Sequence, residues 1–282
     1  MGYIWTVVKQ PAFVRGFFRT DVWGCDQFLR ETAAFRNMAQ EKIQLILRNA
    51  GLASRRGAEQ LIKEGRVTIN GRMVESPHEQ ADPHKDHIKV DDKLLRWRDD
   101  QSRYYVFNKP RFVVSTMKDP QGRPSLGDLI RKISKPLFSV GRLDFDAEGL
   151  MILTNDGEAA HRLSHPSFRI PRIYLVKVRG VPDVQDLGRI RRGMVLGDGD
   201  RLGEVEWKMM KVQSTTTWLR LTLYEGKKNE IKRIFFRIGH PVRKIRRISF
   251  GPIVLGDLPV GAWRPLKESE TERLLALTVR GV

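Results

Sequence analysis

The 282-residue sequence contains one cysteine, Cys25, and no apolar run that approaches the roughly 18 residues of a membrane-spanning helix. A single cysteine excludes a disulfide within the chain and is typical of a reducing compartment, so we expect a cytoplasmic protein without a membrane anchor. Residues 1–37 lack the serine enrichment of a transit peptide, and their apolar pieces are interrupted by charges. We interpret this segment as a variable N-terminal extension or as the product of an upstream start, and its function is open.

Acidic residues are in the minority. The chain carries 51 Lys and Arg against 33 Asp and Glu, which gives a formal net charge of +18. This excess favours a polyanionic partner, because basic side chains that neutralise phosphates release counterions. Charge alone leaves one alternative open, a generally basic soluble protein that binds no nucleic acid.

Residues 138–157, FSVGRLDFDAEGLMILTNDG, are the stretch around which we expect the rest of the chain to be organised. The pattern predicts a strand, an exposed loop and a buried strand, closed by turn-forming Asn, Asp and Gly. The loop presents Arg142 together with Asp144, Asp146 and Glu148. The three acids could bind a metal ion for phosphoryl transfer, or one aspartate could act as a nucleophile without a metal. Spacing alone does not decide between these chemistries and three solvated loop acids.

The pattern GRLDxDxEGLxxLTNDG resembles the catalytic motif of the RsuA/RluB-type pseudouridine synthases, and the resemblance extends from about Glu41 to Leu266. It implies isomerisation of uridine in RNA without a metal or other cofactor, and it makes Asp144 the catalytic aspartate. It also implies an α+β fold, in which a small α/β RNA-binding domain precedes a catalytic domain with a mixed, mainly antiparallel sheet.

Before the central motif, the sequence predicts two short helices and a hairpin. Apolar residues recur at helical spacing in 43–47 and 58–62, and Asn70-Gly71 is typical of a hairpin turn. The segment SRRGAEQLIKEGRVTINGRMV resembles the ribosomal-protein-S4-like RNA-binding domain that precedes the catalytic domain in this branch. We place that domain at 38–96 and a linker at 97–103. Its basic residues predicted to contact RNA are Arg55, Arg56, Lys63 and Arg66.

The catalytic domain is expected at 104–268, followed by a tail at 269–282, and residues 267–282 look like a short helix with an uncertain end. Alternation after Arg172 marks a strand that carries Tyr174, and apolar residues from Ile231 at i, i+3, i+4 and i+7 mark an amphipathic helix that carries Lys232. By resemblance, Tyr174 packs against the target base and Lys232 pairs with Asp144. Residues 181–216 look like scaffold.

Five more basic residues are predicted to contact RNA. Arg142 is expected to fill the gap left by the flipped nucleotide. The others are Lys109, Arg123, Lys228 and Arg233. Phe112 stands where relatives usually carry glycine, so the local backbone there is expected to differ.

The function predicted from these motifs is isomerisation of one uridine in ribosomal RNA, with the large subunit favoured over the small one. The expected partner is ribosomal RNA or a ribosome-assembly intermediate, bound by a monomer that uses no metal and no small-molecule cofactor. The main alternative is a non-catalytic RNA-binding ribosome-assembly factor. A metal-dependent nuclease that uses the three loop acids is a more distant one.

Overall fold

The computed structural model describes residues 40–53, 55–95, 102–131, 133, 137–195 and 199–279. The predicted extension at 1–37 and most of the predicted linker, 97–101, therefore lie outside the described residues. The chain divides into two compact units: residues 1–46 with 55–97 form unit 1, and residues 47–54 with 98–282 form unit 2. No helix in the described parts is long and apolar enough to cross a membrane.

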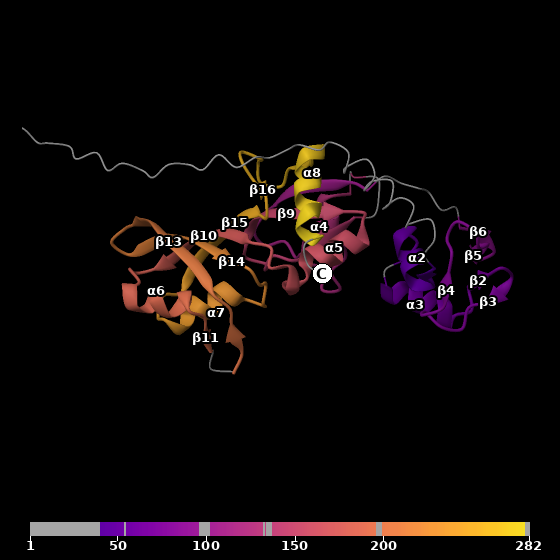
Figure 1. Ribbon diagram of the computed structural model, residues 1–282, viewed down its shortest axis with the longest axis horizontal. Helices are drawn as coiled ribbons and strands as arrows, with labels where there is room; N and C mark the ends of the chain where they lie inside the picture. Colours follow the sequence, from indigo (N-terminus) through magenta and orange to yellow (C-terminus); the bar gives the residue numbers. More distant parts are fainter. Residues whose placement is uncertain are drawn as a thin grey trace, which may run out of the picture. The chain divides into compact units, whose positions relative to one another are not determined.

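Unit 1 combines helix with a small antiparallel sheet, as the sequence predicts (Figure 1). Its sheet has the order β3-β2-β5-β6, and the β2–β3 hairpin turns at Asn70-Gly71. Ala58 and Ile62 of the second helix are buried, as are Val67 and Ile88 of the sheet. The elements are β1 (Glu41–Lys42), α2 (Ile43–Asn49, of which residues 47–49 belong to unit 2), α3 (Arg55–Lys63), β2 (Val67–Ile69), β3 (Arg72–Met73), β4 (Gln80–Ala81), β5 (Ile88–Val90) and β6 (Lys93–Leu94).

Unit 2 is built on a sheet of nine described strands, of which seven follow the order β13-β14-β10-β15-β9-β7-β17. β15 pairs with β9 in parallel, and the other strand pairs of this sheet are antiparallel, so the prediction of a mixed, mainly antiparallel sheet is confirmed. The strands are β7 (Tyr104–Lys109), β8 (Phe138–Val140), β9 (Glu148–Thr154), β10 (Arg172–Arg179), β13 (Val205–Val212), β14 (Thr216–Leu223), β15 (Val242–Phe250), β16 (Ile253–Val254) and β17 (Trp263–Pro265). A separate short ladder joins β11 (Met194–Val195) to β12 (Arg201–Leu202).

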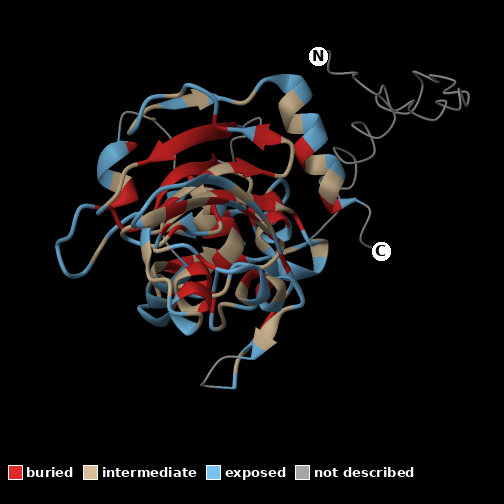
Figure 2. Cartoon of the chain, turned by 90° about the vertical axis from the view of Figure 1, so that its left-hand side faces the viewer, coloured by how far each residue is buried: buried red, intermediate tan, exposed pale blue. Residues whose placement is uncertain are grey.

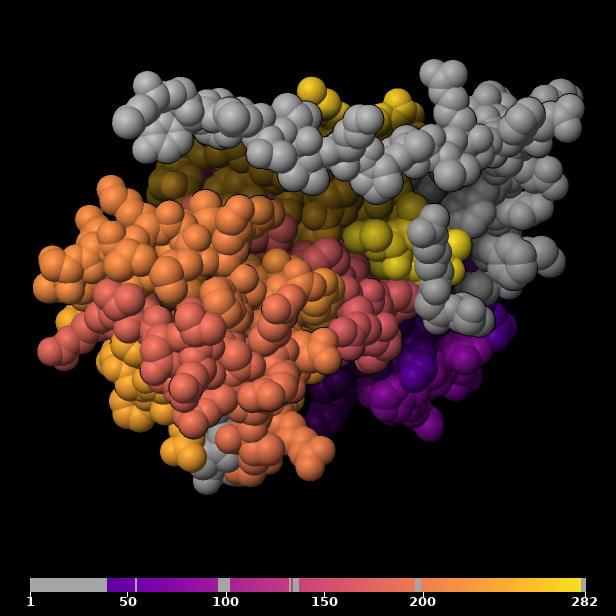
Figure 3. Space-filling view, turned by 60° about the vertical axis from the view of Figure 1, so that its left-hand side comes forward, coloured from indigo at the N-terminus to yellow at the C-terminus, as the bar shows by residue number. Residues whose placement is uncertain are grey.

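Helices cover both faces of this sheet, so its central strands are buried between them (Figure 2). Residues of α4, α6 and α7 belong to the hydrophobic cluster on one face, and residues of α5 and α8 belong to the cluster on the other. α6 and the strands β13 and β14 form one outer surface of unit 2, coloured salmon to orange in Figure 3. The helices are α4 (Leu126–Leu129), α5 (Gly157–Ser164), α6 (Val184–Arg191), α7 (Glu230–Arg237) and α8 (Glu268–Leu275), with short 3₁₀ turns η1 (Pro166–Phe168) and η2 (Ala276–Thr278).

Most local predictions for unit 2 are confirmed, with two differences. β8, an exposed loop and the wholly buried β9 follow the predicted order, and α7 buries Ile231, Ile234 and Phe235 as an amphipathic helix should. The scaffold segment 181–216 contains a helix that the sequence did not indicate, α6, which buries only Leu187 and Ile190. The predicted tail begins inside α8, whose Leu274 is fully buried in the core.

The parallel contact between β9 and β15 depends on Gly149. Arg247 lies opposite Gly149 in the register, and Gly149 has a φ of +112°. A Cβ at this position would lie 2.2 Å from the carbonyl oxygen of Arg247 and 2.7 Å from its nitrogen. Backbone atoms cannot move away as a flexible side chain can, so only glycine allows the two strands to pair here.

We predict that Gly149→Ala lowers the free energy of unfolding by about 3 kcal/mol or more, because it adds a backbone clash to an unfavourable φ. Gly188→Ala is the matched control, since Gly188 lies inside α6 with open space around the position of a Cβ. The control should gain up to about 1 kcal/mol from helix propensity. Chemical denaturation of both variants measures the difference, and a Gly149→Ala protein as stable as the wild type would contradict the strand-crossing argument.

Candidate active site

The loop between β8 and β9 presents Asp144 at the surface of unit 2. Gly141 opens the loop with a φ of +70°, and Leu143 and Ala147 anchor it on either side because both side chains belong to the hydrophobic cluster beneath it. The Asp144 side chain is 36% exposed. The amide of Ala147 donates to the Asp144 carbonyl at 3.1 Å, which closes a turn around the acid. The carboxylate is therefore open to a substrate on a loop that is fixed at both ends.

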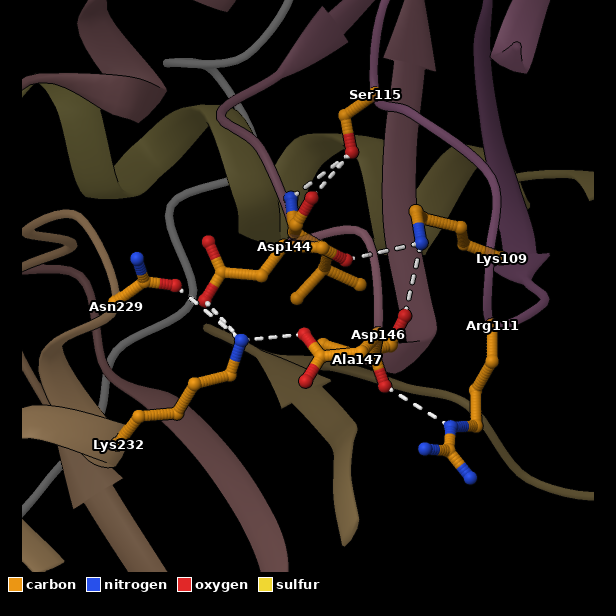
Figure 4. Close-up of polar contacts among 9 residues, drawn as sticks. Lys109, Arg111, Ser115, Asp144, Asp146, Ala147, Asn229 and Lys232 are labelled. Carbon is orange, nitrogen blue, oxygen red and sulfur yellow. Dashed lines mark hydrogen bonds and ion pairs between the residues drawn. The ribbon is translucent and has the colours of Figure 1, made fainter. Parts of the chain in front are cut away.

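Side chains from the preceding segment fasten this loop through its backbone (Figure 4). The Ser115 hydroxyl donates to the Leu143 carbonyl at 2.6 Å and accepts from the Leu143 amide at 3.2 Å. The Nε of Arg111 donates to the carbonyl of Asp146 at 3.1 Å. These bonds hold peptide groups within the 142–147 loop and do not involve the Asp144 carboxylate.

The strongest fastening comes from Lys109, at the end of β7. Its Nζ donates to the carbonyl oxygens of Ala147 at 2.8 Å, Pro110 at 3.0 Å and Asp144 at 3.2 Å, which uses all three ammonium protons. The side chain is fully buried. The prediction that Lys109 contacts RNA is therefore wrong: β7 lies between β9 and β17 in the sheet, and this position points into the protein. Burial lowers the pKa of Lys109 to about 8, and the carboxylates of Asp146 and Asp144 partly oppose that fall.

Lys232 of α7 reaches the same loop from the other side. Its Nζ lies 3.7 Å from Oδ2 of Asp144, contacts Oδ1 of Asp146 and donates to the amide oxygen of Asn229 at 3.3 Å. Asn229 precedes α7 with a φ of 52°, a left-handed conformation that asparagine tolerates better than most residues. The structure brings together Asp144 and Lys232, as the sequence predicts, and adds Asp146 as a second acid on the same ammonium.

Tyr174 lies on β10, where it pairs in register with Leu221 on one side and Arg247 on the other. Its side chain is 8% exposed and belongs to the same hydrophobic cluster as Leu143 and Ala147. Its hydroxyl forms no hydrogen bond with any other described residue. The ring thus contributes to the hydrophobic cluster beneath the loop, and no hydrogen bond joins Tyr174 to Asp144.

The three acids of the motif do not gather around one point. Asp144 and Asp146 share Lys232, whereas Oε1 of Glu148 pairs with Lys244 of β15 at 2.9 Å. The described residues contain no group of three or more His, Cys, Asp or Glu side chains arranged to hold a metal ion. The alternative function of a metal-dependent nuclease therefore has no candidate set of metal ligands among the described residues.

Among the other basic residues of unit 2 that are predicted to contact RNA, some already form ion pairs with carboxylates of the protein. Arg142 and Lys228 are exposed. Arg123 forms a two-pronged pair with Asp119, at 3.0 Å and 2.9 Å, and this guanidinium lowers the pKa of Asp119 to about 2. Arg233 pairs with Asp200 at 2.8 Å. A phosphate at Arg123 or Arg233 would have to compete with these carboxylates.

In unit 1, the predicted contacts lie on and just after α3. Arg55, Arg56 and Lys63 are exposed side chains of that helix. Arg66 donates to both oxygens of Asp91, at 2.6 Å and 2.7 Å, in the turn between β5 and β6. Asp91 has a φ of 50° and the following Asp92 has a φ of 60°. Two successive positive φ values are typical of the type I′ hairpin turn, in which glycine is usual at the second position.

The sequence did not indicate several of these site residues. Ser115 and Arg111 act across separations of 28 and 35 residues, and no local pattern reports such a contact. Asp146 stands out as a conspicuous acid, yet the spacing of the acids does not show that Lys232, 86 residues away, contacts it. Asn229 is the one residue that a local signal could have found, because a polar residue just before an amphipathic helix is typical of a helix start.

Comparisons with known proteins identify the family of this chain. The family model described as RNA pseudouridylate synthase matches residues 103–236, and the model of the S4 domain matches residues 41–93. The chain is 40% identical over 238 residues to "Uncharacterized RNA pseudouridine synthase" of Aquifex aeolicus, covering 84% of this chain and 94% of that protein. It is 36% identical over 243 residues to "Ribosomal large subunit pseudouridine synthase B" of Bacillus subtilis, covering 86% and 98%. A crystal structure of a pseudouridylate synthase, 30% identical, matches with a TM-score of 0.57 and covers 84% of this chain and 100% of that one.

We predict that the free energy of unfolding of the wild type rises with pH between about pH 8 and 10.5 because of Lys109, and that Lys109→Met removes this rise. Between pH 8 and the ordinary lysine pKa of 10.5, the unfolded chain keeps a proton that the folded chain has lost. Stability rises with pH wherever the unfolded state binds more protons, so the wild type should gain stability relative to the variant across this window. A shift of this size corresponds to on the order of 3 kcal/mol.

Denaturant titrations of both proteins at several pH values from 7.5 to 10 measure the gain. Taking the difference between the two proteins removes the titration of every other group. A difference that stays constant with pH would contradict the burial of the charged ammonium.

Proposed function

The chain belongs to the RNA pseudouridine synthase family, and from that premise we propose that it isomerises a specific uridine of large-subunit ribosomal RNA, with Asp144 as the catalytic residue. The observation that carries the proposal is the pair of Asp144 with Lys232, at 3.7 Å, on a loop whose backbone is fastened by Lys109, Arg111 and Ser115. A reactive carboxylate needs a fixed position and access to substrate, and this arrangement supplies both.

The choice of ribosomal RNA rests on the relatives and on charge. The Bacillus subtilis relative carries the large ribosomal subunit in its name, and a second protein of that name, from Pseudomonas aeruginosa, is 35% identical over 239 residues. A net charge of +18 suits a polyanionic substrate. We propose that the protein acts in the cytoplasm as a monomer, on ribosomal RNA or on a ribosome-assembly intermediate.

The reaction moves one bond and needs no oxidant. The bond from the ribose anomeric carbon to ring nitrogen 1 breaks, the uracil turns, and the same ribose carbon bonds to ring carbon 5. The proton of carbon 5 leaves, and nitrogen 1 ends with a proton, so the product is an isomer of the substrate. Asp144 suits the first step as a nucleophile on the ribose carbon or as a base on the ribose, and either role requires only that its carboxylate reach the sugar.

Two further residues have proposed roles in this site. Lys232 balances the charge of the Asp144 carboxylate, and the ring of Tyr174 packs against the target base. A lysine at 232 offers a point charge where an arginine would offer a two-pronged fork, so it can serve both Asp144 and Asp146 from one position.

The basic residues would hold the RNA around the target. Arg142, next but one to Asp144 in the loop, would fill the gap that the flipped uridine leaves in the stack. Residues 38–96 would act as a second RNA-binding domain beside the catalytic domain at 104–268. The residues proposed to contact phosphate are Arg55, Arg56, Lys63, Arg66, Arg123, Lys228 and Arg233.

Pseudouridine mapping of ribosomal RNA incubated with the wild type and with Asp144→Asn, in the presence of a chelator, tests this proposal. We expect one new site in large-subunit RNA with the wild type, and a rate at least about 10³-fold lower with the variant, because the amide cannot replace the carboxylate. Asp186→Asn is the matched control, since Asp186 pairs with Arg189 in α6 and should leave the rate unchanged.

Two outcomes would contradict the proposal. A site that forms at the same rate with Asp144→Asn would remove the aspartate from the chemistry. No site with either protein, on naked RNA and on assembly intermediates, together with tight and salt-sensitive binding, would favour a non-catalytic assembly factor.

A further inference from the structure

Two exposed phenylalanines lie together at the edge of the candidate active site. Phe145 follows Asp144 directly in the loop, and Phe112 lies in the segment that fastens the loop. The rings form an edge-to-face pair with centroids 5.7 Å apart. Phe112 is 54% exposed and Phe145 is 40% exposed. The pair therefore offers aromatic surface to solvent one residue away from the reacting carboxylate.

Both rings are held in place by their backbones. The amide of Phe112 donates to the carbonyl of Phe145 at 2.6 Å, which joins the two loops at the residues that carry the rings. The guanidinium of Arg111 lies 4.8 Å from the centre of the Phe112 ring, while its Nε donates to the carbonyl of Asp146. A cation above an aromatic face restrains the ring and adds positive charge at the same spot.

Phe112 holds this position at a conformational cost. Its φ is +61°, in the left-handed region where a bulky side chain is unfavourable and glycine is favoured. A ring at such a position normally gains stability by burial, but more than half of the Phe112 side chain stays in water. Fold stability alone does not account for a strained, exposed phenylalanine, and strained residues of this kind cluster at functional sites.

We propose that Phe112 and Phe145 form a stacking platform for one unpaired RNA base that neighbours the target uridine. This inference rests on the proposed function. It implies that the substrate RNA has an unpaired nucleotide next to the target uridine. Bases within a duplex already stack on both faces, so only an unpaired base can offer a free face to a ring.

Charge argues for RNA as the occupant of the platform. Arg111 stands against the Phe112 ring, and Arg142 is exposed three residues before Phe145 in the same loop. A nucleotide combines an aromatic face with a phosphate, and aromatic rings flanked by guanidinium groups bind both parts. A second copy of this chain, with the same net charge of +18, would be repelled from this surface.

Binding of a fluorescein-labelled 12-nucleotide oligouridine, followed by fluorescence anisotropy, tests the platform. Asp144→Asn serves as the background for all variants, so the RNA is bound without being isomerised. We expect Phe112→Gly and Phe145→Leu each to raise the Kd by about 10- to 100-fold, the range found when a stacking ring is lost. Binding of the same oligomer annealed to oligoadenosine should stay unchanged.

Three controls keep the result interpretable. Phe112→Gly should melt at the same temperature as its parent or higher, because glycine relieves the strained φ, so weaker binding cannot be ascribed to unfolding. Phe112→Tyr keeps a ring and should restore binding. Val184→Ala removes an apolar side chain that is 75% exposed on α6 and should bind as its parent does.

Several results would overturn the platform. They are an unchanged Kd for Phe112→Gly, an equal loss for single-stranded and duplex RNA, the same loss in Val184→Ala, and self-association of the wild type that Phe112→Gly abolishes. The anisotropy result does not depend on turnover. A protein that makes pseudouridine but binds equally well without Phe112 would refute the platform alone, and one that makes none but needs Phe112 for single-stranded RNA would refute the proposed function alone.

Discussion

The buried ammonium of Lys109 is the interaction on which the site depends. The loop between β8 and β9 has no ladder of its own at Asp144, and three carbonyl oxygens, two of them from this loop, converge on one nitrogen. Burial of a charge is unfavourable unless every proton finds an acceptor, and here each proton does. The three hydrogen bonds of Lys109 hold the backbone of the loop at Asp144 and Ala147, while the Asp144 carboxylate stays partly exposed to solvent. Gly149 complements this arrangement by allowing β9 to pair with β15 directly behind the loop.

The three acids of the motif have different basic partners. Glu148 is buried at the start of β9 and pairs with Lys244, so it belongs to the sheet. Asp144 and Asp146 both face Lys232, and the contact to Asp146 is the closer one. We interpret Asp146 as the residue that positions the ammonium and Asp144 as the residue that meets the substrate. The exposed Phe145 lies between them in the chain, so one short loop carries the proposed catalytic acid, the second acid on Lys232 and one of the two rings of the proposed platform.

The parts of the fold that depend on local order can be predicted from the sequence. The alternation of β10, the apolar spacing of α7 and the strand, loop and strand of the central motif are all encoded within a few neighbouring residues. Lys109 was misjudged because its burial depends on strands β9 and β17, which come much later in the chain. α6 was missed because only Leu187 and Ile190 of its eight residues are buried, too few to give a clear period. Phe112 has a positive φ, the conformation that glycine favours, and its pairing with Phe145 depends on how the two loops fold together.

The most direct test of this account asks which of the two acids beside Lys232 reacts. Release of tritium from ribosomal RNA labelled at carbon 5 of uridine, measured under single-turnover conditions, compares Asp144→Asn with Asp146→Asn. We expect Asp144→Asn to release no tritium above background, whereas Asp146→Asn should stay active at a reduced rate because Lys232 has lost one of its two carboxylate partners. An inactive Asp146→Asn protein beside an active Asp144→Asn protein would contradict the assignment and would make Asp146 the reacting residue.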